Sequence, residues 1–266
     1  MNAHELQAAL RDLPLGGLRF FERIGSTNDE ALAWASHEAT DLSIVIADEQ
    51  TSGRGRLGRK WFTPPQTALA FSLILRPTAD EIKYPTRVTG LGALALTDAV
   101  ALLGLHPQIK WPNDVLLNGK KAAGILVESV WMGDIPDAFV LGMGLNVLAS
   151  SVPPADKILF PATSIETETG KEINRVALLH DVLSSLFTWR QKLGNDEFIK
   201  TWEASLAFRG EEIQLMKENE LPISGNLLGL EPDGSLRLKA NNNSLTVQIG
   251  EIHLRPAGDR ILHQER

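Results

Sequence analysis

The sequence predicts an α+β protein with a small, strand-rich domain at its C-terminal end. Apolar, β-branched strand segments alternate with helical segments over residues 1–210. Asn118-Gly119 lies between two apolar runs, which is the strongest short signal for a β-hairpin. From residue 211 onward, short alternating segments are separated by turn residues. We therefore expect one domain over 1–210 and a smaller all-β domain over 211–266.

Each element is assigned from its apolar spacing or its turn residues. The first half is expected to contain helix 4–12, strand 18–23, a helix capped by Ser26 or Thr27, strand 42–47, loop 48–66, strand 69–75 and helix 85–103. The second half is expected to contain the hairpin strands 114–117 and 122–129, strand 139–148, a polar connection over 150–172, and helices 174–193 and 196–207. The continuous β-branched run 42–47 is typical of a buried strand. Loops as long as 48–66 are uncommon unless they are functional or disordered.

Composition excludes several classes of function. The chain has no cysteine, so disulfides, thiolate nucleophiles and cysteine-bound zinc are excluded. The six histidines form no HExxH motif, so a zinc hydrolase is not expected. The chain shows no apolar run long enough to span a membrane and no secretory signal pattern, so we expect a cytoplasmic protein. A formal net charge of −7 argues against general binding of nucleic acid.

The most informative segment is the loop that ends at Trp61. It combines three glycines, four cationic side chains and the tryptophan: Gly53, Gly55, Gly58, Arg54, Arg56, Arg59, Lys60 and Trp61. The glycines allow backbone N–H groups to surround an anion, the cations suit carboxylate or phosphate, and the indole can stack on a purine. Because the cations repel each other, we expect this loop to be open until an anion binds. A solvated basic loop or an RNA-binding Arg–Gly segment also fits these residues, and the loop alone leaves the choice open.

Two further segments place polar side chains at strand ends. Residues 110–114 (KWPND) form a turn between strands, and Pro112, Asn113 and Asp114 are of ordinary turn types, so a purely structural role also explains them. Lys121 opens an uncharged run beside the hairpin turn, where a partly desolvated ammonium would bind an anion, although a surface lysine explains it equally well. Residues 25–28 (GSTN) stand at a strand-to-helix junction, where helix capping by itself accounts for Ser26 and Thr27.

Together these segments resemble the biotin–protein ligases. The matching motifs are Gly25-Ser26-Thr27-Asn28, Gln50 with Gly53-Arg54-Gly55-Arg56-x-Gly58-Arg59-Lys60-Trp61, Lys110-Trp111-Pro112-Asn113-Asp114, Lys121-x-x-Gly124-Ile125-Leu126-Val127-Glu128 and Gly142-x-Gly144-x-Asn146. The match is strong over 20–150 and weaker beyond. The resemblance implies a mixed sheet flanked by helices, as in class II synthetases, for a biotin- and ATP-binding catalytic domain over 1–210. It also implies an SH3-like β-barrel over 211–266.

The resemblance also implies roles for individual residues. Biotin binding is implied for Ser26, Thr27, Asn28, Gln50, Gly53, Arg54, Gly55, Arg56, Lys121 and Gly124. Nucleotide binding is implied for Arg59, Lys60, Trp61, Asn113 and Asn146, with Trp61 stacking on adenine. Arg56 and Lys121 are implied as catalytic residues, and Asp114 as a ligand of Mg²⁺.

The implied activity is the synthesis of biotinyl-5′-AMP from biotin and ATP, with release of pyrophosphate, followed by transfer of biotin to a lysine of a biotin carboxyl carrier protein. Family members that also repress transcription carry an N-terminal DNA-binding domain. Here the first motif begins after 24 residues, so we expect no specific DNA binding. The alternatives are a lipoate or octanoate ligase of the same fold and a nucleic-acid-binding protein that uses the Arg–Gly loop. The oligomeric state is open, with a homodimer as one option.

Overall fold

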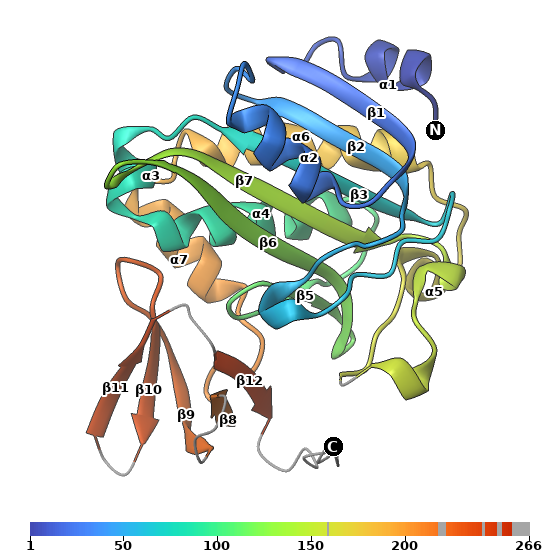
Figure 1. Cartoon of the computed structure of the whole chain (residues 1–266). Coiled ribbons are helices and arrows are strands. Elements are labelled where there is room, and N and C mark those ends of the chain that lie inside the picture. Colours follow the sequence, from blue (N-terminus) through green and yellow to red (C-terminus); the bar gives the residue numbers. More distant parts are fainter. Residues whose placement is uncertain (159, 218–221, 241–242, 249–251, 257–266) are drawn as a thin grey trace.

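A seven-stranded mixed sheet forms the main body of the protein. The structure, a computed structural model, describes residues 1–158, 160–217, 222–240, 243–248 and 252–256. The strands are β1 (Gly17–Ile24), β2 (Ser43–Gln50), β3 (Ala68–Leu75), β4 (Gln108–Lys110), β5 (Asp114–Leu117), β6 (Lys120–Met132) and β7 (Ile135–Asn146). Their order in the sheet is β1-β2-β3-β7-β6-β5-β4 (Figure 1). Only β1 and β2 run parallel, and the other neighbours are antiparallel.

Helices cover both faces of this sheet, which explains its apolar central strands. Successive residues of β2 point to opposite faces: Ile44 and Ile46 pack with helices α4 (Pro85–Ala101) and α6 (Arg175–Arg190), whereas Val45 packs with α2 (Thr27–Ala35). A strand that is covered on both sides carries apolar residues at every position. The expectation that the run 42–47 is a buried strand is thus confirmed.

Most of the expected elements are confirmed, and the missed ones are short. The remaining helices are α1 (Ala3–Ala9), α3 (Ala79–Lys83), α5 (Ile165–Thr169) and α7 (Asp196–Ala204), with 3-10 turns η1 (Arg56–Gly58), η2 (Ala149–Ser151) and η3 (Ala155–Lys157). The strand β4 and the helices α3 and α5 were not expected, because three to five residues are too few to show an apolar period. None of the described helices has the length and apolar character needed to cross a membrane.

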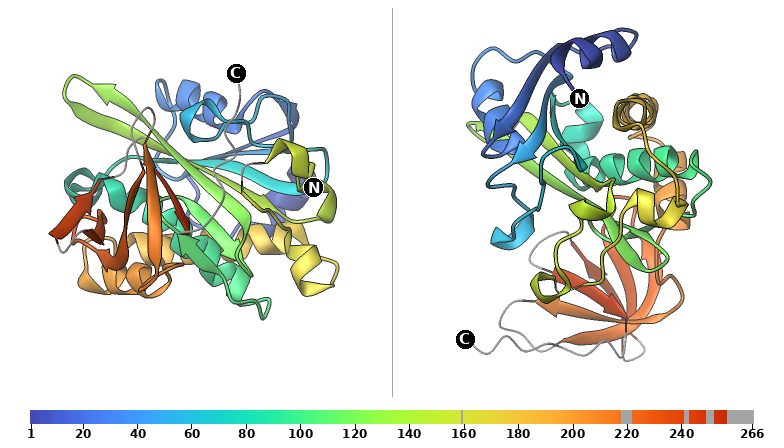
Figure 2. Two further views of the ribbon diagram at one scale, coloured as in Figure 1. Left: turned by 90° about the horizontal axis from the view of Figure 1, so that it is seen from below. Right: turned by 90° about the vertical axis from the view of Figure 1, so that its right-hand side faces the viewer.

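A small antiparallel sheet follows at the C-terminal end, as the sequence predicts. Its strands are β8 (Glu212–Lys217), β9 (Ile223–Leu230), β10 (Leu236–Ala240), β11 (Asn243–Val247) and β12 (Ile252–Pro256), in the order β11-β10-β9-β8-β12. It lies below the main body in Figure 1 and in the right-hand view of Figure 2. The domain boundary between residues 210 and 211 stays a prediction. Residues 257–266 of the expected domain lie outside the described residues.

The turn before β10 joins this small sheet to the main body. The indole Nε1 of Trp111 donates a hydrogen bond of 3.1 Å to the carbonyl of Gly234, and the buried Arg87 donates to the carbonyl of Pro232. The indole of Trp202 packs against both Gly90 and Gly234, where an added Cβ would lie within 3 Å of the ring. The apolar side chains of the small sheet therefore form one continuous core with those of the main body.

Trp111→Phe should lower the free energy of unfolding by roughly 1–3 kcal/mol, because the buried carbonyl of Gly234 loses its donor while most of the ring packing remains. Urea unfolding measures this loss. The control is Trp131→Phe, since Trp131 is 59% exposed at the end of β6. Equal unfolding midpoints for the two variants would show that the Trp111 hydrogen bond does not stabilise this junction.

Candidate active site

A cavity of about 670 Å³ opens on the α2 face of the main sheet. Its walls come from the N-terminus of α2, the glycine–arginine loop (residues 53–61), strands β5 to β7 and the segments 153–158 and 160–162. Every site residue expected from the sequence lines it except Gly53: Ser26, Thr27, Asn28, Gln50, Arg54, Gly55, Arg56, Arg59, Lys60, Trp61, Asn113, Asp114, Lys121, Gly124 and Asn146. Motifs up to 120 residues apart in the sequence thus meet at one place.

A buried polar network forms the wall beneath α2. The Thr27 backbone N–H and hydroxyl donate to Gln50 Oε1 at 2.8 and 3.1 Å. The hydroxyl of Ser72, on β3, lies 2.8 Å from Thr27 Oγ1 and donates to Asn28 Oδ1 at 2.6 Å. Ser26 is the N-cap residue of α2, but its side chain makes no capping hydrogen bond. Ser26 thus stands at the N-cap position, as expected, but the interpretation that capping by itself accounts for Ser26 and Thr27 was wrong, because the Thr27 hydroxyl donates to Gln50.

Ser72 was missed by the sequence analysis, although a signal for it was present. It is the single polar residue in β3, a strand whose residues are all buried. A buried hydroxyl in such a strand must find a hydrogen-bond partner, and its partners here are the two side chains at the start of α2. Ser72 thus connects the sheet to the predicted biotin-binding residues.

Glycines on β6 and β7 make room for the indole of Trp61. A Cβ on Gly144 would lie 2.3 Å from Trp61 Nε1, and a Cβ on Gly124 would lie 3.0 Å from Trp61 Cζ3. On the same face, a Cβ on Gly142 would lie 2.0 Å from Asn28 Oδ1. The absence of a side chain at Gly124 therefore makes room for Trp61, and contact between Gly124 and biotin stays a prediction. Trp61 Nε1 is buried and has no hydrogen-bond partner among the described residues.

The glycine–arginine loop folds as a tight hairpin. The Trp61 N–H donates to the Gly53 carbonyl at 2.8 Å, and the Gly55 N–H donates to the Arg59 carbonyl at 2.7 Å. The turn passes through Leu57, with φ of 57°, and Gly58, with φ of 69°. A Cβ on Gly53 would lie 2.4 Å from the Trp61 carbonyl oxygen. Gly53 thus allows the two limbs of the hairpin to approach each other. It is not among the residues that line the cavity.

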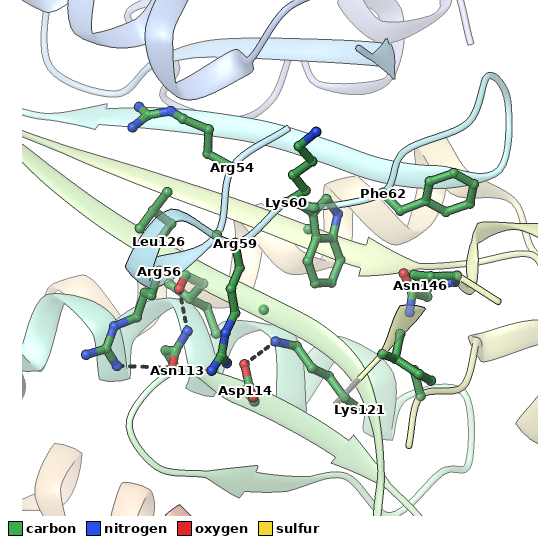
Figure 3. A pocket seen from close by; sticks show the side chains of 18 of the residues that line it. Arg54, Arg56, Arg59, Lys60, Phe62, Asn113, Asp114, Lys121, Leu126 and Asn146 are labelled. Atoms are coloured by element: carbon green, nitrogen blue, oxygen red, sulfur yellow. Dashed lines mark hydrogen bonds and ion pairs between the residues drawn. The ribbon is translucent and has the colours of Figure 1, made fainter. Parts of the chain in front are cut away.

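Cationic side chains from the loop and from the sheet converge on the cavity. Lys121 Nζ lies 2.5 Å from Asp114 Oδ1, and Arg56 donates to Asn113 Oδ1 at 3.2 Å. Figure 3 shows Arg56 and Arg59 reaching toward Asn113 and Asp114 from the loop, with Lys121 approaching from the opposite side. Burial lowers the pKa of Arg56, and the nearby charge of Asp114 opposes this shift. A cation that is partly removed from water interacts more strongly with an anion.

Two asparagines that line the cavity donate hydrogen bonds to backbone carbonyls. Asn113 donates to the Ile125 carbonyl at 2.9 Å, and Asn146 donates to the Thr163 carbonyl at 3.1 Å. Lys110, which the sequence analysis quoted only as part of a motif, also lines the cavity and lies 3.9 Å from both Asp114 Oδ2 and the ring centroid of Phe160. Segments 153–158 and 160–162, which belong to the expected polar connection over 150–172, therefore form a wall of the site.

Asp114, the expected Mg²⁺ ligand, is instead surrounded by ammonium groups. Its carboxylate pairs with Lys121 at 2.5 Å and lies 3.9 Å from Lys110. Among the described residues, no group of three or more histidine or acidic side chains could hold a metal ion. Because Mg²⁺ prefers several oxygen ligands, one carboxylate between two lysines does not fit a metal site built by the protein alone.

The chain is similar to biotin ligases in both sequence and structure. The model of the biotin/lipoate A/B protein ligase family matches residues 20–146. The biotin–[acetyl-CoA-carboxylase] ligase of Paracoccus denitrificans is 34% identical over 241 residues, which cover 86% of this chain and 97% of that protein. The bifunctional ligase/repressor BirA of Bacillus subtilis is 30% identical over 259 residues, which cover 96% of this chain and 79% of that protein. The structure of the biotin protein ligase from Aquifex aeolicus in complex with biotin and ATP matches with a TM-score of 0.77 and 28% identity, over 91% of this chain and 99% of that one.

Proposed function

Because this chain belongs to the biotin–protein ligase family, we propose that it joins biotin to AMP in the cavity described above and transfers the biotinyl group to a lysine of a biotin carboxyl carrier protein. The observation that carries the proposal is the convergence of Arg56, Arg59 and Lys121 on a cavity whose other wall is a neutral, buried polar network. Such a cavity has a cationic end for phosphate and carboxylate and a polar, uncharged end for a ureido ring.

The first half-reaction needs positive charge more than it needs a base. A carboxylate oxygen of biotin attacks the α-phosphorus of ATP, a P–O bond forms, and the bond to pyrophosphate breaks. Two anions approach each other in this step, so cations placed at the reacting groups lower the barrier. Lys121 and Arg56 supply this charge, and the ion pair with Asp114 fixes the position of the Lys121 ammonium. The glycine–arginine loop covers this end of the cavity and shields the mixed anhydride from water.

The second half-reaction needs no nucleophile from the protein. The ε-amine of the acceptor lysine attacks the carbonyl carbon of biotinyl-AMP, an amide forms, AMP leaves and the amine releases a proton. This agrees with a chain that has no cysteine. At the other end of the ligand, Ser26, Thr27, Asn28 and Gln50 offer hydroxyl and amide groups to the ureido ring, and Ser72 contacts Thr27 and Asn28 from behind.

Mg²⁺ enters this proposal only as part of the substrate. Since Asp114 is paired with lysine and does not fit a metal site of the protein, the ion would arrive bound to the phosphates of ATP, which is the usual arrangement for nucleotide substrates. A cytoplasmic location and the absence of specific DNA binding stay predictions from the sequence, and a homodimer stays open.

Exchange of labelled pyrophosphate into ATP tests this function directly. We expect exchange that requires biotin, occurs without any carrier protein, and is accompanied by biotinyl-AMP. Lipoate and octanoate are the matched controls, because the matching family model covers lipoate as well as biotin ligases and the sequence leaves octanoate open as an alternative acid. Exchange that depends on lipoate or octanoate but not on biotin would show that the substrate is one of those acids. Absence of exchange with all three acids would refute the proposed function.

A further inference from the structure

Arg54 has a different environment from the other cations of the glycine–arginine loop. Arg54 and Lys60 form an antiparallel bridge between the two limbs, so their side chains lie on one face of the hairpin, while Arg59, the next residue, lies on the other. Figure 3 shows this alternation: Arg54 and Lys60 point away from the space that Arg56, Arg59 and Lys121 enter. Arg54 and Lys60 are thus the two cations of the loop's outer face, and Arg54 is the one that pairs with acidic side chains.

The partner of Arg54 is Glu128, on β6. The guanidinium donates from both terminal nitrogens to the two carboxylate oxygens of Glu128, at 2.8 and 2.5 Å. This paired geometry is the strongest that the two groups can form. Arg54 also lies 2.8 Å from Asp29 Oδ1, but Asp29 is 59% exposed, whereas the Glu128 side chain is 26% exposed. The better shielded contact restrains the loop more.

Glu128 also contacts the polar network beneath α2. Asn28 Nδ2 donates to Glu128 Oε2 at 2.8 Å, and Asn28 Oδ1 accepts from Ser72. The close approach of Gly142 fixes the Asn28 amide from the other side. One carboxylate therefore joins the first limb of the loop to the residues that line the opposite wall of the cavity.

We propose that Glu128 is a positioning residue for adenylate formation: by holding Arg54 against the sheet, it keeps the inner face of the loop, with Arg56 and Arg59, turned toward the reacting groups. This inference rests on the function proposed above. Arg59 lies opposite Arg54 and Lys60 by strand alternation, and Arg56 begins the 3-10 turn η1 two residues after Arg54, so a contact that fixes Arg54 also fixes the limb that carries both. The carboxylate also neutralises one of the loop's cations and thus reduces the repulsion that opposes its folding.

The variant that tests this role is Glu128→Gln, which keeps the size of the side chain and an oxygen for Asn28 but removes the charge. We expect the rate constant for biotinyl-AMP formation to fall roughly 5- to 10-fold with little change in the KM for biotin, because the variant misplaces the catalytic groups but leaves the biotin-binding residues intact. Without ligands, amide hydrogen exchange over residues 54–60 should become faster. Asp29→Asn is the matched control: it removes an exposed carboxylate from the same arginine and should change the rate less than about twofold.

A second variant distinguishes loss of the Arg54–Glu128 interaction from a general loss of stability. Arg54→Gln removes the same interaction from the loop side, so the double variant with Glu128→Gln should be no slower than the slower single variant. Fully additive losses, or a Glu128→Gln rate equal to that of Asp29→Asn, would overturn the proposal. If the wild-type protein forms no biotinyl-AMP, the proposed function fails, whereas the hydrogen-exchange comparison still decides whether Glu128 holds the loop.

Discussion

Lys121→Ala should slow the formation of biotinyl-AMP by about 100-fold or more, since removing one well-placed charge-stabilising group commonly costs that much in the rate constant. The ammonium of Lys121 faces the cavity from the sheet, opposite Arg56 and Arg59 (Figure 3). Its removal also leaves the carboxylate of Asp114 without its closest cation, at the place where two anions must meet. Both changes raise the barrier, and the effect should appear in the rate at saturating biotin and ATP.

The neighbouring lysine provides the control for this prediction. Lys120 precedes Lys121 on β6, so its side chain points to the opposite face of the strand. Its ammonium pairs with Glu168 at 3.3 Å, and its side chain is 46% exposed. Lys120→Ala should change the rate less than about twofold, because Lys120 is not among the residues that line the cavity and Glu168 keeps its hydrogen bonds from Asn118 and Thr163. Equal single-turnover rates of biotinyl-AMP formation for the two alanine variants would show that Lys121 does not stabilise the reacting charges.

The structure also shows which parts of the fold were visible in the sequence. The hairpin at Asn118-Gly119 and the buried run 42–47 were predicted because their signals are local: a turn type and a continuous apolar strand. The hairpin strand 122–129 was predicted too short, since β6 continues to Met132 against its partner β7. Strand β4 has three residues and exists because it pairs with β5, so no local pattern could indicate it. Short elements that depend on a partner strand are decided by tertiary contacts.

The site was predicted to the extent that its residues lie in local motifs. The loop, Lys121 and the segment around Asn28 were identified in this way, and they do line one cavity. Ser72 and Glu128 were not assigned roles, because each acts through a partner more than 40 residues away in the sequence. Arg54 and Arg56 look equivalent in the sequence, yet Arg54 pairs with acidic groups and Arg56 faces the cavity. Only the fold distinguishes them.

Arg56→Gly should release biotinyl-AMP from the protein roughly 10- to 100-fold faster, because a charge-assisted hydrogen bond to the phosphate is worth about 1.5–3 kcal/mol. Arg56 reaches Asn113 across the mouth of the cavity, and its partly buried charge lies at the cationic end, where the phosphate of the adenylate would bind. Escaped adenylate reacts with any exposed amine. The measurable outcome is biotinylation of an unrelated, lysine-rich protein added to the reaction, together with direct loss of adenylate from the enzyme on gel filtration.

The Arg56→Gly change also makes the loop more flexible, so the effect of losing the charge must be separated from the effect of the added flexibility. Leu57→Gly makes that separation, since it introduces the same residue one position further along the same turn. Leu57 is 43% exposed and has φ of 57°, a conformation that glycine adopts at no steric cost. This variant adds flexibility to the unfolded chain and the loop but leaves every cation in place. If Leu57→Gly retains the adenylate while Arg56→Gly releases it, the guanidinium holds the intermediate. If both release it equally, rigidity of the turn, and not the charge of Arg56, keeps biotinyl-AMP in the cavity.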